Sequence, residues 1–271
     1  MELKDILNTE AFKNYTNQIY SINNEGYPFL TYLGINFTNN EILNFKFYFS
    51  FFKKLSVEEL SKVLPISDFS DFNSLYNLWN SSKTYNSLHQ GATFAIKILP
   101  NYAPTYYFHL RLNTTVYNKP KLLNLETSNC IKNVGFCKEY TTNGYSNKNY
   151  FYFEDKDIIR NLANQYGLNN SKFNPDSIDE LEYIESNNRN KIDLITFDQD
   201  FVEEFLKQKT SKKNQDLFKN ICSIYNFKMY SPGIDSSGNN FSIYFIDANC
   251  INSFTPFDGI KELINKKHYK E

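Results

Sequence analysis

The sequence predicts an α+β fold: an antiparallel ten-stranded β-barrel with a polar lumen, surrounded by α-helices. Three observations lead to this prediction. Segments of alternating apolar and polar residues come in pairs joined by short turns, as in antiparallel hairpins, and amphipathic segments of helical period separate the pairs. One side of each expected strand is rich in Phe, and the other carries Lys, Arg, His and Tyr. No linker rich in Pro, Gly or Ser interrupts residues 1–271, so a single domain is expected.

The expected helices rest on capping residues and on apolar residues at helical spacing. Ser56 with Glu59, and Ser177 with Glu180, have the spacing of capping boxes. Pro256 stands at the first position of a helix, where proline is favoured. The expected helices span 2–22, 57–64, 70–82, 155–166, 177–187, 199–210 and 212–224, and a last one begins at Thr255.

The expected strands rest on alternation of period two. The stretch NFKFYFSFF shows the pattern, because Phe45, Phe47 and Phe49 share one face while Lys46 and Tyr48 share the other. The expected strands span 29–37, 42–52, 91–99, 104–114, 132–141, 148–154, 191–197, 226–231 and 241–247, with 121–127 as the candidate for a tenth. A closed sheet of about ten strands would enclose a ligand-sized space.

The polar faces hold more lysine and tyrosine than a solvated sheet face usually has, which favours a lumen. The pattern Lys-x-Tyr occurs at 46/48, 138/140 and 228/230. Cations that face one lumen repel one another unless an anion joins them, so a socket for a phosphate or diphosphate is expected. Its cationic residues would be Lys46, Lys97, Arg111, Lys138 and Lys228. An open sheet with one wet face and no function is the alternative.

Tyrosine rings in such a lumen can exclude water and stabilise a carbocation by cation–π attraction. The tyrosines on the polar faces are Tyr48, Tyr107, Tyr150, Tyr152, Tyr230 and Tyr244. Glu154 ends one of these faces and is the candidate proton acceptor, with a surface position at the strand end as the alternative. His109 is expected to be a hydrogen-bonding residue of the lumen rather than a catalyst.

Short motifs on the expected strands carry a likeness to a known family. They are KFY at 46–48, IKI around Lys97, HLR at 109–111, KEY at 138–140, YFY at 150–152, KMY at 228–230 and the final hairpin MYSPGIDSSGNNFSIYF. Together they resemble the ABBA-type aromatic prenyltransferases, and the final hairpin looks like that of the cyanobactin peptide prenyltransferases. The resemblance extends over most of the chain, from about 29 to 247.

The resemblance implies a barrel of repeated αββα units and a chemistry for its lumen. Lys, Arg and Tyr would bind an isoprenoid diphosphate, dimethylallyl or geranyl. The prenyl group would pass to an electron-rich aromatic acceptor, a small molecule or a peptide, through an allyl cation shielded by tyrosines. Some members hold Mg²⁺ with an Asp on the second strand; Lys46 stands in that neighbourhood here, so no metal or other cofactor is expected to be required.

Composition and motifs exclude several other classes. The net charge of −1 gives no basic excess for nucleic-acid binding. No apolar run approaches the roughly 20 residues of a membrane helix, and the N-terminal stretch has no secretory pattern. The cysteines Cys130, Cys137, Cys222 and Cys250 lack metal-site spacing, so reduced thiols in a cytoplasmic protein are expected. The motifs G-x-G-x-x-G, G-x-S-x-G, H-E-x-x-H and the P-loop are absent from the sequence.

The sequence is also consistent with two other functions. A non-enzymatic barrel that binds a phosphorylated or aromatic small molecule would share the socket but lack turnover. An interaction protein with an open, tyrosine-rich sheet would have no enclosed cavity. A monomer is expected, and the acceptor, the atom that is prenylated and the donor chain length are not determined by the sequence.

Overall fold

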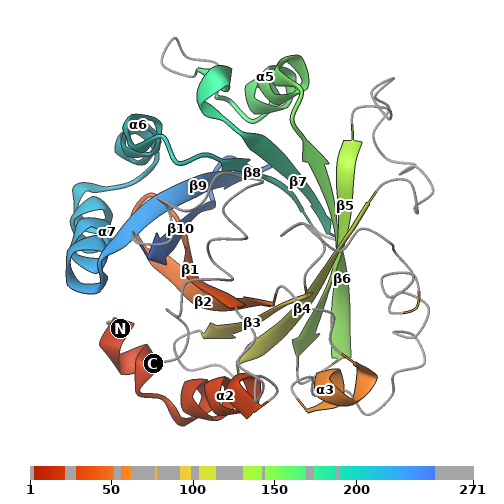
Figure 1. Cartoon of the computed structure of the whole chain (residues 1–271). Helices are drawn as coiled ribbons and strands as arrows, with labels where there is room; N and C mark the ends of the chain where they lie inside the picture. Colours follow the sequence, from red (N-terminus) through yellow and green to blue (C-terminus); the bar gives the residue numbers. More distant parts are fainter. Residues whose placement is uncertain are drawn as a thin grey trace.

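Ten strands form a closed antiparallel barrel in the computed structural model of the chain (Figure 1), which confirms the predicted α+β barrel. The structure describes residues 3–21, 29–51, 56–62, 77, 92–98, 104–113, 131–141, 144–168, 174–186 and 189–247. The strands are β1 (Phe29–Phe37), β2 (Ile42–Phe51), β3 (Ala92–Ile98), β4 (Thr105–Asn113), β5 (Ile131–Thr141), β6 (Gly144–Phe153), β7 (Glu180–Ser186), β8 (Asn190–Ile195), β9 (Phe227–Asp235) and β10 (Phe241–Asp247).

The barrel is an up-and-down meander in which each strand pairs with its neighbours in sequence. The pairing of β1 with β10 closes it, with Tyr32 on β1 opposite Ile246 on β10 and Tyr48 on β2. Closure leaves none of the ten strands with an open edge, and it separates the inner side chains of every strand from the outer ones.

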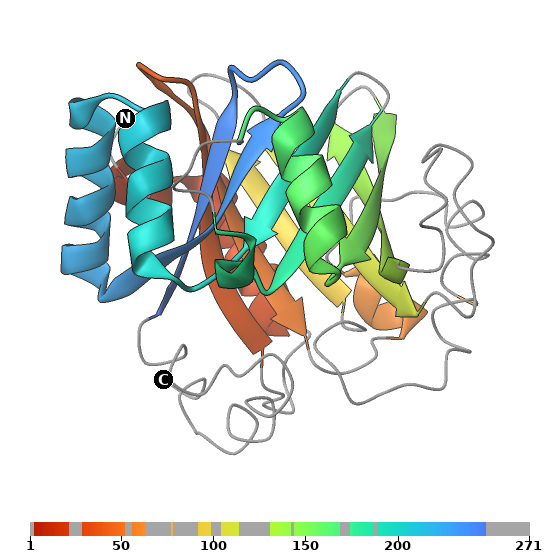
Figure 2. The ribbon, with the colours of Figure 1, turned by 90° about the horizontal axis from the view of Figure 1, so that it is seen from above.

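Helices lie on the outside of the barrel (Figures 1 and 2). They are α1 (Leu3–Leu7), α2 (Glu10–Ser21), α3 (Val57–Ser61), α5 (Lys156–Gln165), the 3-10 helix η4 (Pro175–Ser177), α6 (Gln199–Lys209) and α7 (Lys212–Tyr225). The last three α-helices begin at N-caps, because Asp155, Asp198 and Ser211 each accept hydrogen bonds from backbone N–H groups of the following turn. These caps fix where the helices begin on the sheet.

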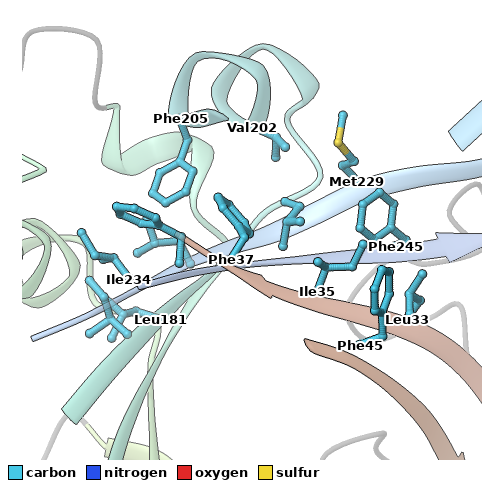
Figure 3. Close-up of a cluster of buried hydrophobic side chains, with 14 of the residues drawn as sticks. Leu33, Ile35, Phe37, Phe45, Leu181, Val202, Phe205, Met229, Ile234 and Phe245 are labelled. Carbon is cyan, nitrogen blue, oxygen red and sulfur yellow. The ribbon is translucent and has the colours of Figure 1, made fainter. Parts of the chain in front are cut away.

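The hydrophobic core lies between the helices and the outer face of the barrel. Figure 3 shows Val202 and Phe205 of α6 over the outward side chains of β1, Ile35 and Phe37 among them. The ring of Phe37 is also 5.1 Å from that of Phe218 on α7. Burial of each such side chain contributes roughly 1.5–3 kcal/mol, so the Phe-rich faces hold the helices against the barrel and leave the other face to the lumen.

A bulge in β9 keeps two functional positions on the inner side. Ser242 pairs with Gly233 and Tyr244 pairs with Tyr230, so β9 has one more residue than β10 between these pairs. Ser231 takes up the change with a φ of 49°. Without the extra residue, Tyr230 and Gly233 could not both be on the same face.

One predicted helix is wrong. Residues 177–187 were expected to be helical on the capping-box spacing, but 180–186 form β7, the strand that completes the barrel. Leu181 and Tyr183 pack into the outer core, while Glu182 and Ile184 face the cavity. The segment therefore alternates with period two, and Glu180 and Glu182 lie in the lumen rather than along a solvated helix.

The remaining differences concern boundaries and undescribed segments. The expected helix over 2–22 is divided into α1 and α2. The candidate strand at 121–127, the expected helix at 70–82 apart from residue 77, and the helix expected after Thr255 lie outside the described residues.

Candidate functional site: the barrel lumen

The lumen contains a cavity of about 550 Å³. This volume is within the range of about 300–1,000 Å³ that small-molecule sites occupy. Its lining combines tyrosines with charged side chains from most of the strands: Tyr32, Asn36, Lys46, Tyr48, Ser50, Thr93, Tyr107, His109, Cys137, Lys148, Tyr150, Tyr152, Glu154, Asp179, Glu180, Glu182, Arg189, Lys191, Tyr230, Ser231 and Tyr244, with Ala95, Ile184, Ser186, Ile195 and Phe197.

Three lysines surround the ring of Tyr107, and we name this group the lysine cluster. The Nζ atoms of Lys46, Lys148 and Lys97 are 4.4, 4.8 and 5.6 Å from the ring centroid. Glu139 lies among them: Oε1 is 3.0 Å from Lys97 Nζ, Oε2 is 2.6 Å from Lys148 Nζ, and the Tyr107 hydroxyl donates to Oε1 at 2.6 Å. The four residues that meet Tyr107 come from β2, β3, β5 and β6, so only the closed barrel brings them together.

The charges of the lysine cluster change the acid–base properties of two of its members. Burial would raise the pKa of Glu139, but the charge and hydrogen bond of Lys148, with Tyr107 and Lys97, outweigh it and hold that pKa well below its usual range. For Lys46, burial and then the charges of Lys148 and Lys97 lower the pKa well below its usual value. Within the described part of the chain, no carboxylate lies within ion-pair distance of Lys46.

Four tyrosines form a second group, the tyrosine cage, on β1, β2, β9 and β10. Tyr32 and Tyr48 stack with centroids 4.4 Å apart and planes 4° from parallel. Tyr244 lies 5.9 Å from both Tyr48 and Tyr230, and Tyr230 stacks on Phe197 at 5.2 Å. Burial raises the pKa of Tyr48, Tyr230 and Tyr244 well above its ordinary value, so these hydroxyls stay neutral.

Asp193 on β8 fixes one side of the cage. Its side chain is fully buried and accepts hydrogen bonds from Ser242 Oγ at 2.8 Å and Tyr244 hydroxyl at 3.1 Å. Lys191 Nζ is 2.7 Å from Asp193 Oδ1 and 5.5 Å from the Tyr244 ring centroid. Lys191, like the lysine cluster, therefore has both a carboxylate and an aromatic ring beside it. Asp193 also holds Tyr244 in one orientation.

A third group lies on β4 and β6. The ring of His109 is 4.5 Å from that of Tyr150, and its Nε2 is 3.3 Å from the Tyr152 hydroxyl. A Cβ at Gly135 would collide with the His109 ring, so glycine at this position leaves room for it. His109 thus lies in the cavity with a hydrogen-bonding partner, as the sequence predicted.

Carboxylates line another part of the cavity, where β6 ends and β7 begins: Glu154, Asp179, Glu180 and Glu182. Phe153 pairs with Leu181, which places Glu154 across from Glu180. A group of three or more His, Cys, Asp or Glu side chains arranged to hold a metal ion is not found within the described residues.

Most of the predicted site residues meet in this cavity. All six predicted tyrosines line it: Tyr48, Tyr107, Tyr150, Tyr152, Tyr230 and Tyr244. Lys46 and Glu154 also line it, and Lys97 borders it through its contacts with Tyr107 and Glu139. Lys228 has the same strand parity as Tyr230 but does not line the cavity. Arg111 on β4 pairs with Gly135 on β5, and its side chain is outside what the structure describes.

The expected position of Lys138 is wrong. On β5, Gly135, Cys137 and Glu139 face inward, and Lys138 lies on the outer side with Val134. The Lys-x-Tyr motif at 138/140 was interpreted as facing the lumen. The apolar residues earlier in the strand instead determine which face is buried under the helices, and Lys138 is on that face. The inward residue of this motif is the glutamate between its lysine and tyrosine.

Sequence reasoning missed residues that belong to the lysine cluster and the tyrosine cage or contact them: Tyr32, Glu139, Lys148, Lys191 and Asp193. It also missed other charged and aromatic residues of the lining: Asp179, Glu180, Glu182, Arg189 and Phe197. Their signal was present as alternation, since Lys148 precedes Tyr150 by two positions and Lys191 precedes Asp193 by two. The expected strand over 148–154 includes Lys148, but only Tyr150, Tyr152 and Glu154 of its polar face were predicted to be site residues.

No protein-family model matches the chain, and a search of curated proteins finds no significant match. Among the helices that the structure describes, none combines the length and the apolar character needed to cross a bilayer.

Proposed function

We propose that the protein transfers a prenyl group from an isoprenoid diphosphate, dimethylallyl or geranyl, to an electron-rich aromatic acceptor. The observation that carries the proposal is the lysine cluster: Lys46, Lys97 and Lys148 gather around Tyr107 with one carboxylate, Glu139, in a cavity walled by tyrosines. An anion of two or more negative charges would offset the excess of lysines, and it would favour the charged form of Lys46.

The lysine cluster would act on the leaving group. When the bond between the prenyl carbon and the diphosphate oxygen breaks, the electron pair stays on that oxygen, and ammonium groups already in place stabilise the added charge. The cluster is held by Glu139 and by the closed barrel, so little reorganisation is needed during the reaction. No metal is required by this scheme, because lysine charges carry out the neutralisation.

The tyrosine cage would act on the prenyl cation. Tyr32, Tyr48, Tyr230 and Tyr244 present ring faces and edges within one small region. Burial raises the pKa of Tyr48, Tyr230 and Tyr244, so these three hydroxyls stay neutral. Aromatic faces stabilise a cation and leave no space for water to trap it. An aromatic ring carbon of the acceptor would then form the new bond and lose its proton, and Glu154 is the proposed proton acceptor.

Two finer features of the fold belong to the same proposal. The order α2-β1-β2-α3 and the hairpin β7-β8 followed by α6 and α7 fit a barrel of repeated αββα units. The inward lysines, tyrosines and carboxylates fit a polar lumen that binds a charged donor. Both support the assignment to the class that the sequence motifs resemble.

Thermal denaturation with dimethylallyl and geranyl thiolodiphosphate, which do not readily ionise, tests donor binding. A ligand at a hundred times its dissociation constant stabilises a fold by about 2.7 kcal/mol, so each analogue should raise the melting temperature clearly more than inorganic diphosphate does. Equal shifts of the melting temperature with both analogues and with inorganic diphosphate would mean that the lumen binds the anion alone and not the prenyl chain. Binding without turnover across a panel of phenols, indoles and tyrosine peptides would favour the non-enzymatic barrel.

A pair of lysine substitutions ties the binding to the lysine cluster. Lys148→Met removes one ammonium from the cluster and should weaken analogue binding by about tenfold or more. Lys213→Met, on the exposed side of α7, is the matched control and should bind like the wild type. If Lys148→Met binds the analogues normally, the donor site is not at Tyr107.

A further inference from the structure

Lys46 differs from the other lysines of the cavity in its surroundings. Lys97 and Lys148 share Glu139, and Lys191 pairs with Asp193. Lys46 faces the ring of Tyr107 at 4.4 Å, and no carboxylate within the described residues is at ion-pair distance from it.

The charged groups around Lys46 come from several strands. Lys97 on β3, Lys148 on β6 and Lys191 on β8 disfavour a further positive charge, and Glu139 on β5 favours it. Tyr48, Tyr107 and Tyr244 on the neighbouring strands remain neutral because burial raises the pKa of each. The lysine cluster has three lysines and one carboxylate, Glu139, which is paired with Lys97 and Lys148, so Lys46 is the member that gives up its proton when the cavity holds no anion.

We propose that Lys46 is a nucleophilic amine, and that the lumen accepts an aldehyde or ketone bearing a phosphate or similar anionic group, which forms an imine with its Nζ. The neutral amine attacks the carbonyl carbon, the oxygen leaves as water, and a C=N bond replaces C=O with no change in oxidation state. A buried lysine with a free electron pair is the usual source of such imines.

The cavity meets the other requirements of this reaction. Lys46 lines it, so a ligand reaches the amine. Lys97 Nζ and Lys148 Nζ are 3.0 and 2.6 Å from the Glu139 carboxylate, so both lie where they can bind the anionic group. The ring of Tyr107 lies beside the amine and Tyr48 lines the same cavity, and such aromatic surface suits a planar carbonyl compound. The inference goes beyond prenyl transfer and does not depend on it.

Pyridoxal 5′-phosphate is the probe, because borohydride reduces its imine to a stable adduct that peptide mass spectrometry locates. At neutral pH, Lys46 should be modified about tenfold or more faster than exposed lysines such as Lys213. Inorganic diphosphate should protect Lys46, since it occupies the place of the probe's phosphate in the cluster and excludes the aldehyde. Pyridoxal, which lacks the phosphate, should react more slowly with Lys46, and an equal rate would overturn the requirement for an anionic group.

Lys46→Arg, which keeps a cation but cannot form an imine, should lose the fast modification. A second measurement does not depend on this variant folding: in the wild type, the modification rate of Lys46 should stay high at a pH where that of Lys213 has fallen. The proposal is overturned if Lys46 is modified no faster than exposed lysines, or if its rate follows theirs with pH. Donor-analogue binding is measured separately by melting temperature, so a failure there would not be confused with a failure here.

Discussion

Gly233 lies opposite Asp193 in the pairing of β9 with β8, and a Cβ at Gly233 would overlap Oδ1 of Asp193 and stand 2.9 Å from its Cγ. Asp193 cannot move aside cheaply, because Ser242, Tyr244 and Lys191 all bind its carboxylate. Glycine is therefore required here for close approach between two strands rather than for an unusual backbone angle.

Gly233→Ala should lower the free energy of unfolding by about 2–4 kcal/mol, because it displaces a buried, charge-paired carboxylate. Urea denaturation measures the loss, and Ser236→Ala in the adjacent exposed turn is the control, expected to differ from the wild type by less than about 0.5 kcal/mol. A stable Gly233→Ala protein would show that Asp193 has another position available.

Glu139→Gln should destabilise the protein in a way that depends on pH. The pKa of Glu139 is held low in the folded state, so its contribution is complete above the unfolded-state value near 4.3 and is lost as the pH falls toward the folded-state value. At neutral pH the substitution should cost about 2–4 kcal/mol, since it leaves Lys97 and Lys148 without their carboxylate.

Urea denaturation from neutral pH down to about pH 3 tests this dependence. The gap between wild type and Glu139→Gln should narrow as the pH falls below about 5. Glu58→Gln is the control, because Glu58 is in an exposed ion pair with Lys62, and it should show a small and nearly constant effect. A gap for Glu139→Gln that does not change with pH would contradict the role of its charge.

The sequence predicted the barrel and its tyrosines because alternation is a local property. Phe45 and Phe49 mark the outer face of β2 without knowledge of the rest of the chain, so Lys46 and Tyr48 were assigned correctly to the inner face. The prediction for β7 was wrong for the same reason. Glu180 and Glu182 favour a helix locally, and only closure of the barrel makes an inward glutamate acceptable.

The contents of the lysine cluster were harder to predict, because they depend on register between distant strands. Glu139 meets Lys97 and Lys148 across three strands, and a shift of one residue in β5 would replace it with Lys138. Polar residue types alone therefore indicated a charged lumen, but not which charges share a partner.

The thiol of Cys137 should be slow to react with iodoacetamide in the folded protein. Burial raises its pKa to about 11, so its thiolate fraction at pH 8 should be roughly two orders of magnitude below that of an ordinary thiol near 8.5. Mass spectrometry of the Cys137 peptide in native buffer and in urea measures the difference. Alkylation at the same rate in both would show that the lumen exposes an ionised thiol, contrary to this burial.

Lys46→Met should stabilise the protein when no anion is bound. Lys46 has a folded-state pKa well below the value near 10.4 of the unfolded chain, so protonation of the unfolded chain costs the wild type stability as the pH falls below about 10. Methionine has a similar length and no charge, and it should raise the free energy of unfolding at neutral pH by about 1–3 kcal/mol. The gain in the free energy of unfolding should shrink toward about pH 10, where the unfolded amine also becomes neutral.

Lys213→Met, exposed on α7, is the control and should change stability by less than about 0.5 kcal/mol at either pH. A loss of stability in Lys46→Met that is the same at both pH values would mean that the Lys46 amine keeps its proton in the folded protein, and the nucleophile assignment would fail with it.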